Sequence, residues 1–313
     1  MLRRHGITDV VLSCSYLVDE VRRIMGDGAD HGVRLRYAVE TDPLGTAGGI
    51  RNAVDLVRDL LVVLNGDILA DPDLTAMLAF HAVRGSYATI YLTRVSDPSQ
   101  YGLVELDADS RIQSFIEKPE PGRATVDTIN AGVYVLHRAV VAAIPTGRAV
   151  SIERETFPGL LRARVPFYGW VSENYWLDIG NPTKYRQGQL DLMAGRITTD
   201  VAPPGSRTDG LRVAPGARVA PDATLSAPCV IGAGTQVESG ARVGPNAVLG
   251  AGCVVGPGAR VEGAILWDAV TVGPNAILQD CIVGSHVRIG AGAQLGCSAV
   301  VEGHTAIPAN ARL

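Results

Sequence analysis

Apolar runs and amphipathic segments alternate along the first two thirds of the chain. Runs of mainly aliphatic and β-branched residues bounded by polar or turn residues predict buried strands, namely DVVLS from Asp9, LLVVL from Leu60, ATIYLTRV from Ala88 and AGVYVL from Ala131. Two segments between and after these runs begin with Asx-Pro and end near glycine, which predicts helices capped by Asp71 and Asn181. Alternating strands and helices predict an α/β domain with a mainly parallel sheet, whose carboxyl ends bind ligands.

From about residue 211 onward the pattern changes to a repeat of six residues. Aliphatic residues recur at steps of six from Val213 to Val261, and a small residue stands two places before nearly every one. Steps of eleven then follow, from Val261 to Val272 and from Val272 to Val283, and we interpret each as six plus five. Sixes resume at Ile289. This pattern predicts a left-handed parallel β-helix, in which each aliphatic residue points into the axis.

The segment 196–212, RITTDVAPPGSRTDGLR, separates the two patterns and is rich in proline, glycine and polar residues. We therefore predict a catalytic domain at 1–195, a linker at 196–212 and a β-helix at 213–313.

Composition narrows the function classes. The net charge is −4, which predicts no general attraction to nucleic acid or to an anionic membrane. No apolar stretch is long enough to span a bilayer and the first residues lack a signal peptide, so we expect a cytoplasmic protein. The five cysteines form no CxxC pair, which favours a packing role over disulfides or zinc.

A glycine-rich segment, TDPLGTAGGIRNA, runs from Thr41 to Ala53. Gly45, Gly48 and Gly49 permit close approach of the backbone to an anionic or flat ligand, and we expect a helix to begin just after them with free N-terminal amides. A plain structural turn is about as well supported by these glycines alone.

Two aspartates stand where the chain leaves predicted strands. Asp67 follows the run LLVVL after Asn65-Gly66, and Asp178 precedes Gly180 in NYWLDIGNP. Carboxylates at the mouth of an α/β sheet are ligands that Mg²⁺ prefers, and the two could share one ion that also holds phosphate oxygens. Ordinary turn and cap roles are the alternative.

Lysine is rare in this chain, since Lys118 and Lys184 are its two lysines among 28 basic residues. Lys118 follows Glu117 in SFIEKPEPG, and a compact cation there suits a phosphate, although a solvent-exposed pair would explain it too. Lys184 lies on the exposed face of a predicted helix and is expected to be structural.

The motifs PLGTAGGI, LNGD, YG, EKP, NAGVYVL, SIERETFPGLL and YWLDIGNPTKY occur in this order ahead of the hexapeptide repeats. Taken together, they resemble the sugar-1-phosphate nucleotidylyltransferases over essentially the whole chain. The segment SIERETFP, between NAGVYVL and YWLDIG, makes the guanylyltransferases that act on mannose 1-phosphate the most similar members.

The resemblance implies a Rossmann-like catalytic domain that transfers a nucleotidyl group from a nucleoside triphosphate to a sugar 1-phosphate. It further implies a Mg²⁺ cofactor. The net charge leads us to expect no nucleic acid or membrane partner, and a solenoid with an apolar terminal coil commonly self-associates, so we expect a homo-oligomer. The implied site residues are Lys118 for the sugar phosphate, Asp67 and Asp178 for Mg²⁺, Leu44, Gly45, Thr46, Ala47 and Gly48 for the nucleotide, and Gly102, Glu117 and Asn130 for the sugar.

Members of this family begin with a strand and a glycine-rich loop of the pattern GGxGTRLRPLT, whereas this chain opens at LRRHGITDVVLSCSY. We therefore expect an N-terminally truncated catalytic domain with two unpaired sheet edges, and a start upstream of Met1 or a fragment. The alternatives are another base or sugar (uridylyl, thymidylyl or adenylyl transfer to glucose 1-phosphate), an inactive regulatory subunit that binds nucleotide-sugar, or an acyltransferase with His286 or His304 as its base.

Overall fold

The computed structural model describes residues 1–117, 126–199, 206–296 and 298–313, and it describes the side chains of neither residue 117 nor residues 206–208. Its contacts divide the chain into two compact units, Met1–Trp176 and Leu177–Leu313. This boundary lies ahead of the helix that ends the domain predicted from sequence at residue 195.

The first unit is built on a six-stranded sheet in the order β7-β6-β8-β5-β9, with β3 also paired to β8. Its strands are β3 (Leu60–Leu64), β5 (Ala88–Arg94), β6 (Gly102–Leu106), β7 (Ile112–Glu117), β8 (Thr128–His137) and β9 (Phe167–Val171). All four apolar runs singled out in the sequence form strands. β5 and β8 bury aliphatic side chains on both faces of the sheet, whereas β1 has no fully buried residue.

The sheet is mainly antiparallel, so the expectation of a mainly parallel sheet is wrong. β8 runs antiparallel to β3, β5 and β6, and β6 is antiparallel to β7, whereas β5 and β9 are parallel. The physical reason is β8, which at ten residues is long enough to pair with β5 along one edge and with both β6 and β3 along the other.

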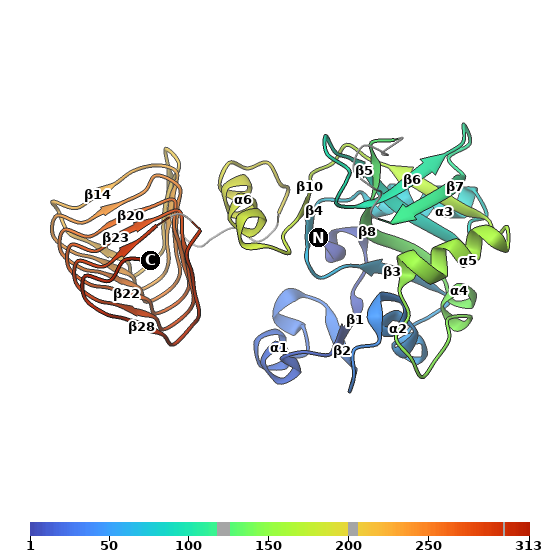
Figure 1. Ribbon diagram of the computed structural model, residues 1–313, viewed down its shortest axis with the longest axis horizontal. Helices are drawn as coiled ribbons and strands as arrows, with labels where there is room; N and C mark the ends of the chain where they lie inside the picture. Colours follow the sequence, from blue (N-terminus) through green and yellow to red (C-terminus); the bar gives the residue numbers. More distant parts are fainter. Residues whose placement is uncertain (118–125, 200–205, 297) are drawn as a thin grey trace. The chain divides into compact units, whose positions relative to one another are not determined.

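Helices cover both faces of this sheet (Figure 1). Alternation along β5 and β8 sends Ile90 and Tyr134 to one apolar cluster and Tyr91 and Val133 to the other. The helical segments are η1 (Leu2–His5), α1 (Val18–Met25), η2 (Ala29–His31), α2 (Gly45–Asn52), η3 (Val54–Leu56), α3 (Leu74–Val83), α4 (Arg138–Ala142), the π-helical η4 (Ile152–Thr156) and α5 (Phe157–Arg162). α3 packs in the cluster of Tyr91, while α5 packs in that of Ile90.

The helix predicted with Asp71 as its N-cap begins two residues later. Asp73 caps α3 and accepts a hydrogen bond from Ala76 N at 2.9 Å. Asp71 instead follows β4 (Ile68–Ala70), donates its N–H to Tyr175 O and pairs its carboxylate with Arg4 at 3.1 Å. These contacts hold Asp71 outside the helix.

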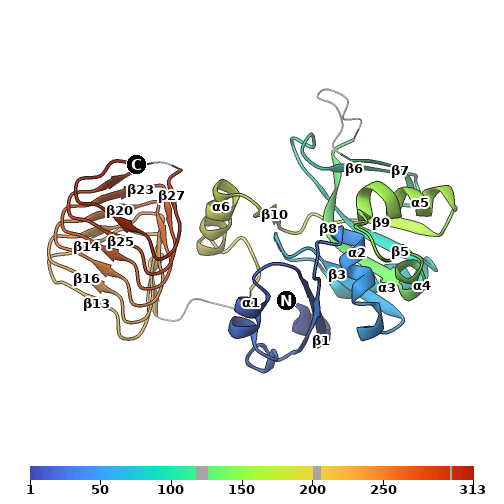
Figure 2. The same cartoon turned by 60° about the horizontal axis from the view of Figure 1, so that its bottom comes forward.

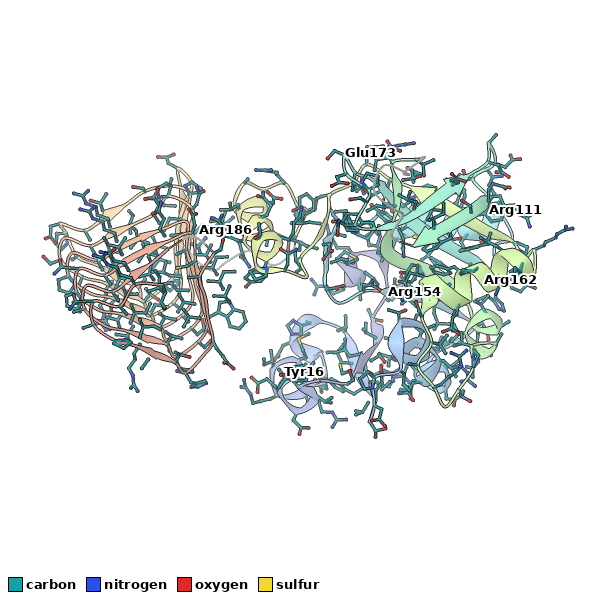
Figure 3. The ribbon with its side chains drawn as sticks, viewed as in Figure 1. Tyr16, Arg111, Arg154, Arg162, Glu173 and Arg186 are labelled. Carbon is teal, nitrogen blue, oxygen red and sulfur yellow. The ribbon has the colours of Figure 1, made fainter. Side chains whose placement is uncertain are left out.

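A separate two-stranded sheet contains the beginning of the chain. β1 (Asp9–Cys14; labelled in Figure 2) pairs in parallel with β2 (Arg34–Val39), and the two strands form a sheet of their own. Within the described ranges β1 pairs with β2 alone and β3 with β8 alone, which agrees with the expectation of two unpaired edges. Tyr16, just after β1, is 79% exposed (Figure 3).

The second unit is a parallel β-helix of three sheets preceded by β10 (Trp176–Asp178), which begins at the unit boundary, and α6 (Pro182–Met193). Its repeating aliphatic residues form one continuous buried core, as the six-residue repeat predicts. The first sheet consists of β11 (Ser206–Thr208), β12 (Leu211–Val213), β15 (Cys229–Ile231), β18 (Ala247–Leu249), β21 (Ile265–Leu266), β24 (Ile282–Val283) and β27 (Val300–Val301). The second sheet consists of β13 (Arg218–Val219), β16 (Gln236–Val237), β19 (Val254–Val255), β22 (Thr271–Val272), β25 (Arg288–Ile289) and β28 (Ala306–Ile307). The third sheet consists of β14 (Thr224–Leu225), β17 (Arg242–Val243), β20 (Arg260–Glu262), β23 (Ile277–Gln279) and β26 (Gln294–Leu295).

The two irregular steps of the repeat are shortened corners, as predicted. Most coils pair residues 18 apart, such as Cys229 with Ala247, but Val248 pairs with Ile265 and Ile265 with Ile282, both 17 apart. Each missing residue falls at the corner that leads from the third sheet into the first. The β-helix therefore keeps a continuous core, and the shortening by one residue is confined to one of its three corners.

The cysteines of the β-helix serve packing, as expected. Cys229, Cys253 and Cys281 are buried and form no disulfide, and burial raises the pKa of the Cys229 thiol to about 12. Cys297 lies outside the described residues. Within the described ranges, no helix combines the length and apolarity that crossing a bilayer needs.

Candidate active site

The structure brings several predicted site residues to the point where β8 changes partners. Asn65, which follows β3, donates its N–H to Gly132 O at 2.8 Å, and Gly132 N donates to the Asn130 Oδ1 at 3.0 Å. Gly132 has a φ of +72°, and a Cβ there would lie 2.9 Å from the Asn65 amide nitrogen. The irregular segment 130–132 thus locks the turn that carries Asp67.

Asp67 stands in the exposed turn between β3 and β4, as the sequence predicts. Within the part of the chain that the structure describes, its carboxylate has neither a hydrogen-bond nor an ion-pair partner. Both oxygens are therefore available to a cation or to a ligand.

Gly102, Glu117 and Asn130, the predicted sugar contacts, come from adjacent strands. Gly102 pairs with Glu117 between β6 and β7, and Leu103 pairs with Ile129 between β6 and β8. The antiparallel register places Gly102 beside Asn130. The half-buried Asn130 donates from Nδ2 to the Tyr134 hydroxyl at 3.0 Å, which orients its amide.

Trp176 joins this cluster although sequence reasoning gave it no role. Its indole Nε1 donates to Ala131 O at 2.8 Å, and its ring meets the Tyr101 ring edge-on at 5.4 Å between centroids. Trp176 therefore contacts both the motif YG, through Tyr101, and the motif NAG, through Ala131. The available signal was its place in the motif YWLDIG.

The glycine-rich segment has a different geometry from the one expected. α2 begins at Gly45, inside the glycines, and its early amides are engaged: Ala47 N and Gly48 N donate to Val150 O at 2.9 and 3.3 Å. Val150 N in turn donates to Leu44 O at 2.8 Å. Gly45 has a φ of +72°, and a Cβ there would lie 2.8 Å from Val150 O. The expectation of a helix that begins after the glycines with free N-terminal amides is therefore wrong, because α2 begins at Gly45 and Val150 O accepts from two of its first four amides.

Two glutamates that sequence reasoning left without a role support this segment. The Glu153 carboxylate accepts from the hydroxyls of Thr46 and Ser151, each at 3.1 Å, and Thr46 Oγ1 accepts from Ile152 N at 2.8 Å. Glu40 accepts from Leu44 N at 2.9 Å. Glu153 lies in the motif SIERETFP, whereas Glu40 had no signal beyond its position just before the glycines.

Asp178 is half-buried and belongs to the second unit, whereas Asp67 belongs to the first. Its Oδ1 accepts from Gly180 N at 2.8 Å. The predicted cap is confirmed, since Asn181 Oδ1 accepts from Lys184 N at 2.9 Å and Pro182 opens α6. Lys184 is exposed, as expected of a structural residue.

The donor set fits a hard cation. Within the described ranges no three His, Cys, Asp or Glu residues form a cluster suited to a metal. The carboxylates of Asp67 in the first unit and of Asp178 in the second, taken separately, are of the ligand type that Mg²⁺ prefers, and this ion is usually held by one or two carboxylates with substrate phosphates and water completing its shell. Lys118, the predicted phosphate ligand, lies outside the described residues, as does the Glu117 side chain.

His286 and His304 lie on exposed turns of the β-helix with φ of +60° and +62°. Their rings stack on each other at 4.9 Å between centroids. The arrangement favours the surface role over that of a catalytic base.

A family model described as nucleotidyl transferase matches residues 1–195, and one described as the left-handed β-helix (LbH) domain of EIF2B subunit epsilon matches residues 212–313. The chain belongs to the nucleotidyl transferase family, and its second unit is a left-handed β-helix.

Relatives with named activities are similar to this chain. A mannose-1-phosphate guanylyltransferase of Mycobacterium tuberculosis is 41% identical over 234 residues, which cover 74% of this chain but 64% of the relative. A UTP–glucose-1-phosphate uridylyltransferase of Synechocystis sp. is 29% identical over 304 residues, 90% of this chain and 77% of the relative. The structure of HddC from Yersinia pseudotuberculosis complexed with GMP-PN matches with a TM-score of 0.52 and 27% identity, over 60% of this chain and 80% of HddC.

Proposed function

We propose that this protein transfers a nucleotidyl group from a nucleoside triphosphate to a sugar 1-phosphate and releases pyrophosphate, with GTP and mannose 1-phosphate as its substrates. The observation that supports the proposal is that β8 runs beside Gly102 at Asn130 and holds, through Gly132, the turn that carries Asp67, in a member of the nucleotidyl transferase family. The M. tuberculosis relative supports the choice of base and sugar.

The proposed reaction is an in-line attack by a sugar-phosphate oxygen on the α-phosphorus of the triphosphate, with pyrophosphate leaving on the opposite side. It needs no covalent side-chain intermediate, and positioning and charge neutralisation supply the rate. Leu44, Gly45, Thr46, Ala47 and Gly48 face the nucleotide in this proposal, and Gly102, Glu117 and Asn130 contact the sugar. Lys118 holds the sugar phosphate.

Asp67 and Asp178 hold Mg²⁺ in the same proposal. When bound, the ion neutralises charge on the phosphate oxygens. The carboxylates themselves fix where that charge is neutralised, Asp67 from the turn locked by Gly132 and Asp178 from the turn closed by Gly180 N.

A glucose-directed uridylyltransferase is the second candidate, favoured by the Synechocystis relative that aligns over 90% of this chain. Both candidates use the same site chemistry. They differ in which base and which sugar the site accepts.

The test is a matrix of the four ribonucleoside triphosphates and dTTP against mannose, glucose and galactose 1-phosphates, with pyrophosphate release measured in Mg²⁺. We expect the GTP and mannose 1-phosphate pair to give the highest kcat/KM. A higher value for UTP and glucose 1-phosphate would select the second candidate. No release with any pair, from protein that binds nucleotide-sugar, would replace catalysis with the regulatory subunit.

Self-association and a cytoplasmic location complete the proposal. The last coil described exposes the apolar side chains of Val300 and Leu313, which are 55% and 59% accessible. Sedimentation should give a mass above the 32.9 kDa of one chain, and a monomer at micromolar concentration would refute self-association.

A further inference from the structure

Arg186 connects α6 to the β-helix within the second unit, and Figure 3 shows its side chain pointing from α6 toward the β-helix. The Arg186 guanidinium forms a direct ion pair with Asp280, and its Nη1 lies 3.5 Å from Gly263 O. Tyr185 adds a ring contact with Trp267 at 6.5 Å between centroids. The paired side chains are 29% and 34% exposed, so the contact is partly withdrawn from solvent.

Arg186 contacts the β-helix at the two shortened corners of the repeat, those of Gly263 and Asp280. Gly263 and Asp280 occupy the same corner in successive coils, and each of these coils advances 17 residues instead of 18. Gly263 has a φ of +60°, and a Cβ there would lie 2.2 Å from Asp280 Oδ1. The irregularity in the hexapeptide pattern therefore coincides with the place where α6 docks.

The fastened helix leads directly to a predicted metal ligand. Arg186 lies in the first half of α6, whose N-cap Asn181 is three residues beyond Asp178. The link is short and ordered by hydrogen bonds from Gly180 N to Asp178 and from Lys184 N to Asn181. A displacement of α6 must therefore move the Asp178 turn.

We propose that Arg186 and Asp280 are positioning residues that hold the Asp178 turn in its metal-binding arrangement through α6. The proposal rests on the proposed function, because Asp178 is a metal ligand there. It makes the β-helix the support of the Asp178 turn. An ion pair suits this role since charged partners form stronger and more directional hydrogen bonds than neutral ones.

The first test is amide hydrogen exchange of the full-length protein without metal. Asp280→Asn should speed exchange in segment 177–193 several-fold while the β-helix strands keep their protection, and Asp280→Glu should restore protection. Asp222→Asn is the matched control, because Asp222 lies at a different corner, where its Oδ2 accepts from Ser239 at 2.7 Å. Unchanged exchange in Asp280→Asn would overturn the proposal.

The second test is direct binding of Mn²⁺, followed by its electron paramagnetic resonance signal, together with the Mg²⁺ dependence of turnover. Asp280→Asn and Arg186→Met should each weaken Mn²⁺ binding and raise the Mg²⁺ concentration for half-maximal activity roughly tenfold. The KM for sugar phosphate should change less.

Failure of the positioning role and failure of the proposed function give different experimental results. Faster exchange in segment 177–193 with unchanged Mn²⁺ affinity would leave α6 docked by the pair but overturn its role toward Asp178. If the wild type turns over no substrate pair, the proposed function fails, while weaker Mn²⁺ binding in Asp280→Asn still supports the positioning role.

Discussion

The Thr46 hydroxyl joins the glycine-rich segment to Ile152 and Glu153, and its removal can be tested without changing side-chain size. Thr46→Val leaves the Ile152 N–H without its acceptor, and Ile152 is fully buried. We expect a loss of about 1 kcal/mol in the free energy of unfolding, measured in urea, and a larger rise in KM for the nucleotide than for the sugar phosphate. Thr46→Ser keeps the hydroxyl and should behave as wild type; equal losses in both variants would refute this role.

Asp178→Asn keeps the size of the side chain and its acceptor for Gly180 N but removes its charge. If Asp178 holds Mg²⁺, the variant should lose at least about 100-fold in kcat/KM with an unchanged circular dichroism spectrum. Asp109→Asn, at a side chain that is 82% exposed, is the control and should remain active. Near wild-type turnover of Asp178→Asn in Mg²⁺ would remove Asp178 from the metal site.

Lys118→Ala tests the proposed phosphate contact through the ratio of two Michaelis constants. Loss of a charge-assisted contact of roughly 1.5–3 kcal/mol should raise the KM for the sugar phosphate by about 10- to 100-fold. The KM for the nucleotide should change much less, and Lys184→Ala, on the exposed face of α6, should change neither. Equal KM values in wild type and Lys118→Ala would return Lys118 to a solvent-exposed role.

Single residues were predictable from sequence where the signal was local. Asp67 was expected at the end of a buried run and Asn181 as a cap, and both expectations are confirmed because a few neighbouring residues decide them. Glu40 and Asp280 had no such signal, and Glu153 had only its place in the motif SIERETFP. Thr46 meets Glu153 across 107 positions and Arg186 meets Asp280 across 94, so their roles depend on the folded chain.

At the scale of elements, the change of pairing partner along β8, from β6 to β3, depends on Gly132. Gly132→Ala would place a Cβ within 3.2 Å of three Asn65 side-chain atoms and would also strain a φ of +72°. We expect a loss of more than about 2 kcal/mol in the free energy of unfolding. Because the Asn65 turn carries Asp67, kcat should fall as well.

Gly147→Ala is the matched control for Gly132→Ala. Gly147 has a φ of +76° but open space around its Cβ position, so this variant pays for backbone strain alone, about 1–2 kcal/mol. The difference between the two variants measures the contact with Asn65. Equal destabilisation would show that the close packing at β8 contributes nothing.

Elements with a strong period were predicted best. The six-residue repeat and its two shortened units were read correctly because each coil buries one aliphatic residue per face. The direction of the strands in the first sheet was not, since a buried run looks the same in parallel and antiparallel pairing. The start of α2 was missed because Val150 O, a distant acceptor, fixes the early amides.

At the scale of the whole molecule, α6 belongs by its sequence to the family model that ends at residue 195 but by its contacts to the second unit. Cooperative unfolding follows contacts, since a helix of this length has little stability without tertiary packing. We therefore predict that α6 loses its structure together with the β-helix, and that it does not follow the first unit.

Hydrogen exchange at increasing urea concentrations measures this directly. Amides of segment 182–193 should lose protection at the same urea concentration as those of β20 and β23, the strands that end just before Gly263 and Asp280. Arg186→Met should uncouple them, so that α6 opens at lower urea than these strands. If α6 instead follows β5 and β8 in both proteins, the functional boundary lies at residue 195, and the β-helix is a neighbour of the Asp178 turn without supporting it.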